Sequence, residues 1–239
     1  MTDTTTPSTS TLEREAAAWR ERFETAEAED VLRWALGRFH PRIALACSFQ
    51  AEDMVILDMM ARLRPGARAF YLDTGLHFAE TYQVRDLVAA RYDIELTRYA
   101  PELSVAEQAV RYGPNLWARD PNLCCNLRKV EPLRRALAGL DAWVTGIRRE
   151  QTPQRRNAGV VEWDARFRLV KINPLAGWTT DEVWDYLRSR DVPYNPLHEM
   201  GYPSIGCIPC TSPVLDGDDP RAGRWPGFDK TECGLHADP

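Results

Sequence analysis

Two pairs of cysteines have the spacing in this chain that most clearly indicates chemistry. Cys124 and Cys125 are adjacent, in the stretch CCNLRK, and Cys207 and Cys210 form a CIPC turn. Adjacent cysteines are poorly suited to bridging each other, because a disulfide needs a specific dihedral angle and Cβ separation. A CxxC turn places two thiolates where both can reach one centre. The sequence therefore predicts that the four thiols share an inorganic centre, either zinc or an iron–sulfur cluster.

An iron–sulfur cluster suits the adjacent pair better than zinc does. Neighbouring side chains diverge, which hinders binding to one tetrahedral zinc ion, whereas the separate irons of a cluster can be ligated from different directions. Arg128 and Lys129 each follow one of the paired cysteines by four residues, so on a helix each cation would share a face with a thiolate. The N-terminus of that helix would add partial positive charge. An isolated pair of adjacent cysteines would be read as buried apolar residues, but with the CIPC turn we favour a 4Fe-4S cluster.

A fifth cysteine, Cys233, lies in the polar stretch ECGLH near the end of the chain. Lys230 and His236 flank it, and nearby cations favour the thiolate form. Gly234 would give the backbone the mobility that a nucleophile needs if it must meet two partners in turn. Cys47 matches no ligand position and is expected in the core.

Anion-binding chemistry is indicated at two further segments. The stretch TGIRREQTPQRR (145–156) contains four arginines, and RAGRW (221–225) adds Arg221 and Arg224. The planar guanidinium suits phosphate and sulfate. A run of charge is more often a solvated surface, but the first of these segments directly follows an expected strand, where ligands bind in α/β folds.

The elements that must position these residues alternate between strand and helix. Helices are predicted at 12–38, 51–63, 78–92, about 125–138 and 179–190, the last with a capping box of Thr179 and Glu182. Strands are predicted at 42–49, 67–74, 94–100, 142–147 and 167–175. Short connections between them predict one α/β domain, a doubly wound and mostly parallel sheet covered by helices. Frequent Pro and Gly after residue 191 argue against regular structure there.

Composition and charge limit the possible domain organisation, location and partners of the protein. We expect a disordered tail at 1–11, an α/β domain at 12–215 and a mobile segment at 216–239 that carries Cys233. The net charge of −5 argues against a protein that coats nucleic acid. No apolar run is long enough to span a bilayer, and the polar start does not read as a secretory signal. The sequence is therefore typical of a cytoplasmic protein with reduced thiols, and a homo-oligomer is compatible with it.

The turns that follow the first two strands are candidate ligand-binding loops. The stretch CSFQAED (47–53) joins the first strand to its helix, where a helix N-terminus can receive a phosphate and Ser48 could donate to an anion. The stretch YLDTG (71–75) ends the second strand. By itself, a DTG sequence is only a common ending of a strand.

The combination of CCNLRK, CIPC and ECGLH resembles the assimilatory sulfonucleotide reductases, in particular their adenylyl-sulfate (APS) reductase branch. The resemblance runs from about residue 40 to residue 236. It implies an adenine nucleotide α-hydrolase-like fold with a modified P-loop, and one 4Fe-4S cluster on the two cysteine pairs that supports the site electrostatically. It also implies that Cys233 attacks the sulfur of APS and releases AMP, and that thioredoxin then reduces the enzyme adduct to free sulfite.

Site residues follow from these loops and from the resemblance together. Catalytic roles are expected for Cys233, Lys129 and His236, with Lys129 between the cluster and the phosphosulfate. Substrate contacts are expected from Ser48, Glu52, Asp53, Leu72, Thr74, Gly146, Arg149, Arg156, Arg221 and Arg224. Gln50 departs from the family's glycine-containing loop, and its Cβ requires the backbone to avoid a strained positive φ at that position.

Other functions remain in competition at this point. Reduction of the 3′-phosphorylated substrate PAPS, or of both substrates, is the nearest, although PAPS-specific members typically lack both cysteine pairs. A cluster-dependent tRNA thiolase would usually carry an SGGxDS loop, which this chain lacks, and would leave ECGLH unexplained. A zinc-stabilised binding module would keep its function after Cys233→Ser. Because only three residues follow ECGLH, we expect electrons from a separate protein, thioredoxin, and expect no nucleic-acid or membrane partner.

Overall fold

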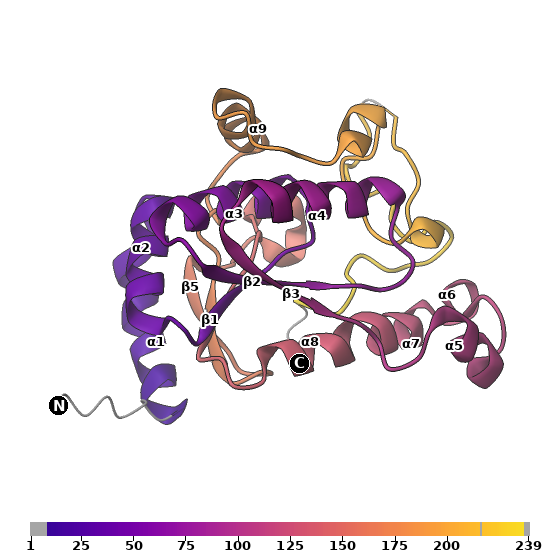
Figure 1. The fold of residues 1–239 in the computed structure, drawn as a ribbon, viewed down its shortest axis with the longest axis horizontal. Coiled ribbons are helices and arrows are strands. Elements are labelled where there is room, and N and C mark those ends of the chain that lie inside the picture. The colour runs from indigo at the N-terminus through magenta and orange to yellow at the C-terminus, as the bar shows by residue number, and fades with distance from the viewer. Residues whose placement is uncertain (1–8, 216, 237–239) are drawn as a thin grey trace.

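A six-stranded sheet in the order β3-β2-β1-β4-β6-β5 forms the middle layer of the structure (Figure 1). The structure is a computed structural model that describes residues 9–215 and 217–236. Its strands are β1 (Ile43–Ala46), β2 (Ala67–Leu72), β3 (Ile94–Tyr99), β4 (Ala142–Val144), β5 (Val161–Asp164) and β6 (Leu169–Ile172). The neighbouring strands pair in parallel except at the edge, where β5 runs antiparallel to β6. The mostly parallel, doubly wound sheet predicted from the sequence is confirmed.

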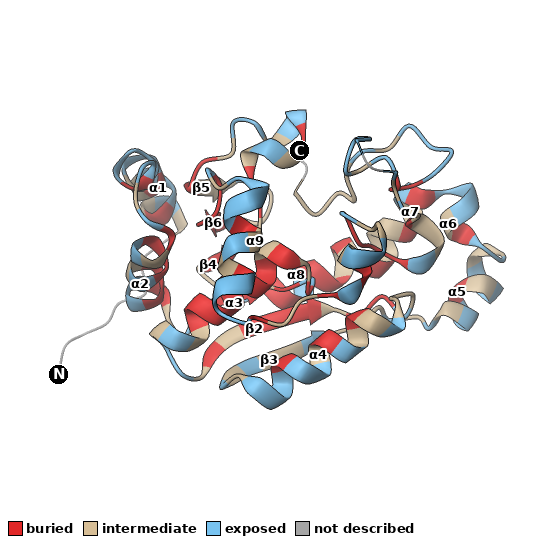
Figure 2. Cartoon of the chain, turned by 90° about the horizontal axis from the view of Figure 1, so that it is seen from above, coloured by how far each residue is buried: buried red, intermediate tan, exposed pale blue. Residues whose placement is uncertain are grey.

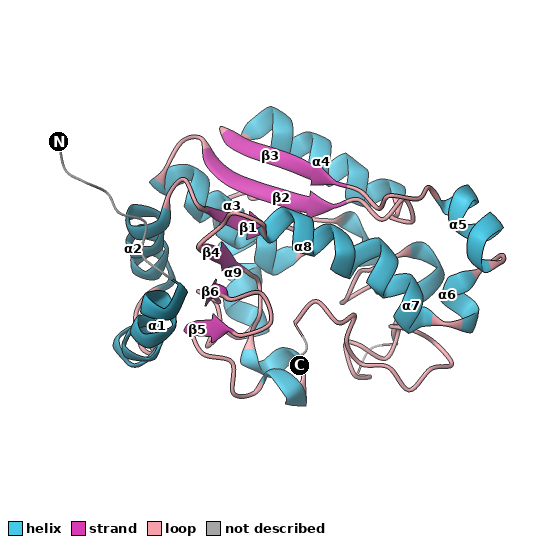
Figure 3. Cartoon of the chain, turned by 90° about the horizontal axis from the view of Figure 1, so that it is seen from below, coloured by secondary structure: helices cyan, strands magenta, loops and turns pink. Residues whose placement is uncertain are grey.

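Helices cover both faces of this sheet. They are α1 (Thr9–Phe23), α2 (Ala28–Phe39), α3 (Ala51–Leu63), α4 (Ala79–Arg91), α5 (Val105–Tyr112), α6 (Leu116–Arg119), α7 (Pro121–Cys125), α8 (Glu131–Leu137) and α9 (Thr180–Ser189). Helices α3 and α4 lie on one face and α8 on the other, as Figures 1 and 3 show. Helix α9 packs on α3, and α1 packs along β5 and β6. None of the helices in the described part of the chain is both long and apolar enough to cross a bilayer.

The alternation of side chains along the strands builds one core on each face. On β1, Ile43 and Leu45 point into the larger core with α2, α3 and α9, whereas Ala44 points into a smaller core under α8. On β4 the buried Trp143 fills the centre of the smaller core. Figure 2 shows the buried residues concentrated in the sheet and in the helix surfaces that face it. Fully buried strands are expected where helices cover both faces of a sheet.

The helix predicted over 12–38 is two helices, and this prediction was wrong. The chain leaves helical geometry after α1, and Glu27 is extended with φ −63° and ψ 141°. The break folds α2 back on α1, so that the rings of Phe23 and Trp34 pack with their centroids 4.3 Å apart and their planes tilted by 35°. Helix α1 also begins at Thr9, inside the tail expected at 1–11; the remainder of that tail lies outside the described residues.

The predicted helix near 125–138 begins earlier, at Pro121, and contains a wider turn. Asp120 caps it by accepting a hydrogen bond from the amide of Leu123. Residues Asn126–Val130 form a π-helical turn just before Pro132. A proline has no amide hydrogen to continue the i to i−4 ladder, and π turns occur often at functional sites. This turn presents Arg128 and Lys129.

Other predictions agree more closely. Helix α3 has the predicted bounds, and the Thr179 and Glu182 capping box of α9 is present, with the Thr179 amide 2.7 Å from the Glu182 carboxylate. The strands end two or three residues earlier than predicted at β1, β2, β4 and β6. The short edge strand β5 and the helices α5 and α6 were not predicted.

Candidate active site

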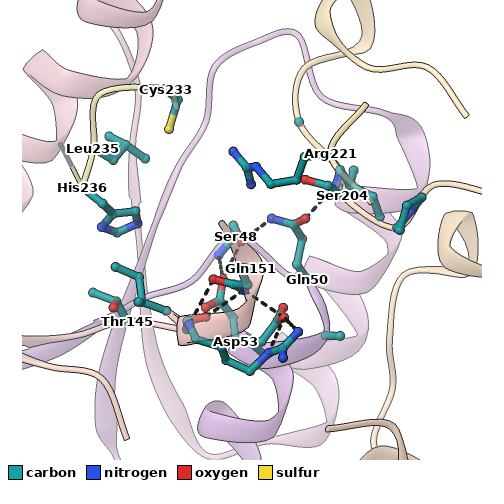
Figure 4. Close-up of a pocket in the computed structure, with 18 of the residues that line it drawn as sticks. Ser48, Gln50, Asp53, Thr145, Gln151, Ser204, Arg221, Cys233, Leu235 and His236 are labelled. Atoms are coloured by element: carbon teal, nitrogen blue, oxygen red, sulfur yellow. Dashed lines mark hydrogen bonds and ion pairs between the residues drawn. The ribbon is translucent and has the colours of Figure 1, made fainter. Parts of the chain in front are cut away.

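A cavity of about 950 Å³ opens beyond the carboxyl ends of β1 and β4. Strand order reverses between these two strands, since β2 and β3 follow on one side of β1 and β4 and β6 on the other. Ligands of doubly wound sheets bind at such a point. The cavity is lined by the loop 47–53, the arginine-rich loop 145–156, the segment 203–206 and the C-terminal segment 219–236 (Figure 4). The segments predicted to bind substrate therefore meet at one place.

Ser48 lines this cavity and binds Asp53. The Ser48 amide and hydroxyl both donate to Oδ2 of Asp53, at 2.6 and 2.5 Å. Burial raises the pKa of Asp53 to about 6, although the two hydrogen bonds from Ser48 oppose this rise. The first turn of α3 thus carries a buried acid that titrates in the weakly acidic range.

Gln50 is accommodated without strain. Its φ is −84°, and the positive φ in this loop falls on its neighbour Phe49 at 62°. The Gln50 side chain accepts a hydrogen bond from the Ile205 amide at 2.7 Å and donates one to the Ser48 hydroxyl at 3.2 Å. It therefore ties the phosphate-loop candidate to the segment that precedes Cys207, a contact that the sequence did not predict.

Glu52, expected to contact substrate, lines the cavity and also holds the arginine-rich loop. Its carboxylate accepts from Arg148 Nε at 3.0 Å and from Gln151 Nε2 at 2.9 Å. Arg148 is buried and also donates to the Trp178 carbonyl and the Thr180 hydroxyl. Arg148 was not singled out in the sequence, because nothing in a run of arginines marks the one that turns inward.

The other expected residues of this loop line the cavity. Arg149 and Arg156 both do so, and Arg149 also donates to the Ala158 carbonyl at 2.8 Å. Gly146 permits a close approach, since a Cβ there would lie 2.5 Å from Oδ1 of Asp53. The sequence did not single out Arg155, which forms an ion pair with Glu232 of the C-terminal segment.

The two residues expected from the YLDTG turn separate in space. Leu72 lines the large cavity, whereas Thr74 is fully buried and is absent from its lining. The Thr74 hydroxyl oxygen lies 3.4 Å from the Cys207 sulfur, and its carbonyl accepts from Arg128 Nε at 2.5 Å. Thr74 therefore belongs to the surroundings of the cysteines.

The two cysteine pairs come together at a second, small cavity. Cys124, Cys125, Cys207 and Cys210 all line it, together with Lys129 and other residues, and all four are free thiols. Burial, together with the neighbouring thiolates, raises the pKa of Cys124 to about 11 and that of Cys210 to about 12. Within residues 9–215 and 217–236, no group of three or more His, Cys, Asp or Glu side chains is placed to hold a metal ion.

Cys233 lies at the wall of the large cavity, and its sulfur points inward (Figure 4). Burial opposes ionisation of this thiol, but the Lys129 ammonium, the Leu235 amide and the Arg224 guanidinium lower its pKa below the ordinary value. Lys129 lines both cavities. Burial opposes its charge, yet the Cys207 and Cys233 thiolates raise its pKa. The structure thus places the expected nucleophile beside the expected cation.

His236 packs against the smaller core. Its ring stacks on Trp143 with centroids 5.5 Å apart and planes 19° apart. Burial, with the charges of Lys171 and two arginines, lowers its pKa well below the ordinary value, so the ring is neutral. Its Nδ1 atom is buried without a hydrogen-bond partner among the described residues. His236 is also among the residues that line the large cavity.

Arg221 and Arg224 also line the cavity. Arg224 is buried and donates to the Ser204 hydroxyl at 3.0 Å, while Arg221 donates to the Thr231 carbonyl at 2.7 Å. The Nε atoms of both arginines are buried, and no partner for them lies in the described part of the chain. Two unpaired donors thus remain beside the cavity.

Comparison with known proteins agrees with this geometry. Residues 42–213 match the family model "Phosphoadenosine phosphosulfate reductase domain". The chain is 49% identical over 213 residues to an adenosine 5'-phosphosulfate reductase of Staphylococcus haemolyticus (89% of this chain, 88% of that protein). It is 50% identical over 230 residues to a phosphoadenosine 5'-phosphosulfate reductase of Gloeobacter violaceus (95% and 94%). The structure resembles a crystal structure of phosphoadenylyl-sulfate reductase from Candida auris in complex with phosphate, with a TM-score of 0.75, 33% identity and coverage of 84% and 97%.

Proposed function

Because the chain belongs to the phosphoadenosine phosphosulfate reductase domain family, we propose that it reduces adenosine 5'-phosphosulfate (APS) to sulfite and AMP. The observation that carries this proposal is the position of Cys233, whose pKa is lowered and whose sulfur faces the cavity at the switch point of the sheet. A thiolate there can attack a sulfur atom held by arginines.

The reaction proceeds in two steps. In the first, the Cys233 thiolate attacks the sulfur of the sulfuryl group, the bond from that sulfur to the phosphate oxygen breaks, and AMP leaves with the electron pair. Lys129 and Arg224 lower the pKa of the nucleophile, and Arg221 and Arg224 line the cavity that would hold the anionic ligand. The product is an enzyme S-sulfocysteine.

The second step needs a dithiol reductant, for which thioredoxin is proposed. One of its thiolates attacks the Cys233 sulfur and sulfite leaves with the electron pair. Its second thiol resolves the mixed disulfide and restores the Cys233 thiolate. The sulfur is reduced by two electrons as the dithiol is oxidised to a disulfide. For thioredoxin to reach Cys233, the C-terminal segment must move away from the cavity. A reducing compartment such as the cytoplasm would keep thioredoxin reduced and so sustain the cycle.

We assign one 4Fe-4S cluster to Cys124, Cys125, Cys207 and Cys210. The residues fit such a group, because four free thiols from two distant segments line one cavity and the side chain of Lys129 lies beside them. A cluster binds each thiolate to a separate iron, so the sulfurs need not converge on one point. When bound, the cluster supplies electrostatic support to the site.

The relatives favour APS but leave one alternative. The Staphylococcus protein is named for APS and the Gloeobacter protein for PAPS, at similar identity. The paired cysteines favour APS, and reduction of PAPS is the second candidate. Sulfite release from each nucleotide in the presence of thioredoxin distinguishes the two. A strong preference for PAPS would reject our assignment of the substrate.

The test of the reaction is Cys233→Ser, compared with the unaltered protein. We expect Cys233→Ser to abolish AMP release from APS and to keep the iron content, measured by elemental analysis of anaerobically purified protein. AMP release by Cys233→Ser at the rate of the unaltered protein would refute the mechanism, and active protein without iron would refute the cluster.

A further inference from the structure

The residue before the nucleophile is held by two arginines. Both oxygens of the Glu232 carboxylate accept hydrogen bonds from Arg155, from Nε and from a terminal nitrogen, each at 2.8 Å. Arg221 approaches the same carboxylate at 3.4 Å and donates to the carbonyl of Thr231. The Thr152 hydroxyl lies 3.5 Å from Oε1 of Glu232. One carboxylate thus connects the arginine-rich loop, the segment around 221 and the C-terminal segment.

This ion pair differs from an ordinary surface pair in burial and geometry. The side chains of Glu232 and Arg155 are 14% and 13% exposed. Exposed ion pairs contribute little because solvent screens them and because flexible side chains must be ordered. A two-pronged contact between a guanidinium and a carboxylate is stronger and fixes orientation. The contact can therefore hold the backbone next to Cys233 in place.

Further contacts hold the C-terminal segment on both sides of Cys233, including one from Lys230 to the Asn122 side chain at 2.6 Å. Arg166 donates to the Gly234 carbonyl at 2.5 Å, Leu235 packs against the smaller core, and His236 stacks on Trp143. On the near side, the described contacts closest to the nucleophile are those of Glu232 and of the Thr231 carbonyl. Breaking the Glu232 ion pairs would therefore free the approach to Cys233 from one direction while leaving the remainder of the segment anchored.

We propose that Glu232 is the positioning residue of the nucleophile segment: its ion pairs with Arg155 and Arg221 dock Cys233 in the cavity. Docking places the thiolate at the sulfuryl group for the first step, and release exposes the adduct to the reductant for the second step. The kinetic part of this inference rests on the proposed function, whereas the docking itself does not.

The test compares Glu232→Gln with Arg155→Gln, because the two changes alter the charge near Cys233 in opposite directions. Glu232 raises the pKa of the Cys233 thiol, so Glu232→Gln by charge alone would speed alkylation. Loss of the Arg155 cation by charge alone would slow it. Undocking exposes the thiol in both variants. We expect iodoacetamide to alkylate Cys233 about tenfold faster in both variants, which is the scale of a lost charge-assisted contact. The experiment uses the full-length protein without nucleotide, and mass spectrometry identifies the alkylated residue.

Asp141→Asn is the matched control. Asp141 is a carboxylate of similar burial, 13% exposed, that binds Arg42 at 2.8 Å, and it precedes β4 at the end of the sheet opposite the cavity. We expect this variant to keep the unaltered alkylation rate. In the double variant of Glu232 and Arg155, the rate should rise no further than in the single variants, because both changes break the same contact.

The reaction provides a second readout. In a single turnover, Glu232→Gln should release AMP about tenfold more slowly, whereas reduction of a preformed adduct by thioredoxin should be as fast as in the unaltered protein or faster. A merely structural role would slow both steps. If Glu232→Gln does not fold, Glu232→Asp shortens the side chain and has the same expected direction.

Two results would overturn the proposal. One is opposite changes of the alkylation rate in the two variants, which charge alone would produce. The other is a rate in either variant equal to that of Asp141→Asn. Should alkylation follow the expectation while even the unaltered protein fails to release AMP from APS, the docking role stands and the proposed function fails.

Discussion

Replacing Asp53 by asparagine should change how the stability of this protein depends on pH. Asp53 is 6% exposed, and burial raises its pKa from 3.8 to about 6 against the effect of the Ser48 hydrogen bonds. The folded protein therefore holds the Asp53 proton more tightly than the unfolded chain does. Asparagine keeps an oxygen acceptor for the Ser48 donors but cannot ionise, so it removes the titration with little change of shape.

The direction and the size of this pH dependence follow from the different proton affinities of Asp53 in the folded and unfolded states. Between about pH 4 and pH 6 the folded state retains a proton that the unfolded state has lost, so the free energy of unfolding falls as the pH rises through this window. A pKa rise from 3.8 to about 6 corresponds to about 3 kcal/mol, because one pKa unit is about 1.36 kcal/mol. Above pH 7 both states have ionised Asp53, and this contribution is constant.

The assay is urea unfolding of the unaltered protein and of Asp53→Asn, under anaerobic conditions, from pH 4 to pH 8. The stability of the unaltered protein relative to the variant should fall by about 2.5 kcal/mol between pH 4 and pH 7 and then stay level. Carbon-13 NMR of labelled aspartate carboxyls reports the pKa of the folded state directly, and the variant identifies the Asp53 signal. A signal titrating near 3.8, or a stability difference that does not change with pH, refutes the reasoning.

Two glycine substitutions test close contacts at the cavity. In Gly206→Ala, the new Cβ would lie 2.3 Å from a terminal nitrogen of the buried Arg224, so we expect the guanidinium to shift. The affinity for AMP in calorimetric titration should fall about tenfold, the scale of one lost charge-assisted hydrogen bond. An unchanged affinity would contradict this expectation. In Gly146→Ala, the Cβ would lie 2.5 Å from Oδ1 of Asp53, and the overpacking should lower the free energy of unfolding by about 1–3 kcal/mol. Urea midpoints equal to those of the unaltered protein would show that the loop yields freely.

The parts of the fold that the sequence predicts well are those set by local pattern. Helix α3 and the capping box of α9 depend on nearest neighbours along the chain, and they have the predicted form. The break between α1 and α2 depends on the stacking of Phe23 against Trp34 across a turn. Apolar spacing is nearly continuous through that turn, so the pattern alone gave one helix. The edge strand β5 is four residues long and pairs only with β6, which leaves little periodicity to detect.

In the candidate site too, local pattern predicts some features, whereas others depend on contacts between distant segments. The ends of parallel strands meet at one edge of a sheet, so the sequence pattern alone places the loops after β1 and β4 together. Side-chain pairs between distant segments could not be. Gln50 with Ile205, Arg148 with Glu52 and Arg155 with Glu232 each join segments whose mutual orientation only the folded chain defines.

The charges at Lys129 and Cys233 depend on each other. Burial opposes the ammonium of Lys129 and the thiolate of Cys233 alike, and each group would tend to be neutral alone. Side by side, each stabilises the charge of the other. Lys129 can lie there because the π turn before Pro132 presents it toward both cavities, and Cys233 can lie there because the contacts of Glu232 and Leu235 hold the C-terminal segment against the cavity. The docked segment therefore keeps Cys233 beside Lys129, and this contact lowers the pKa of the thiol.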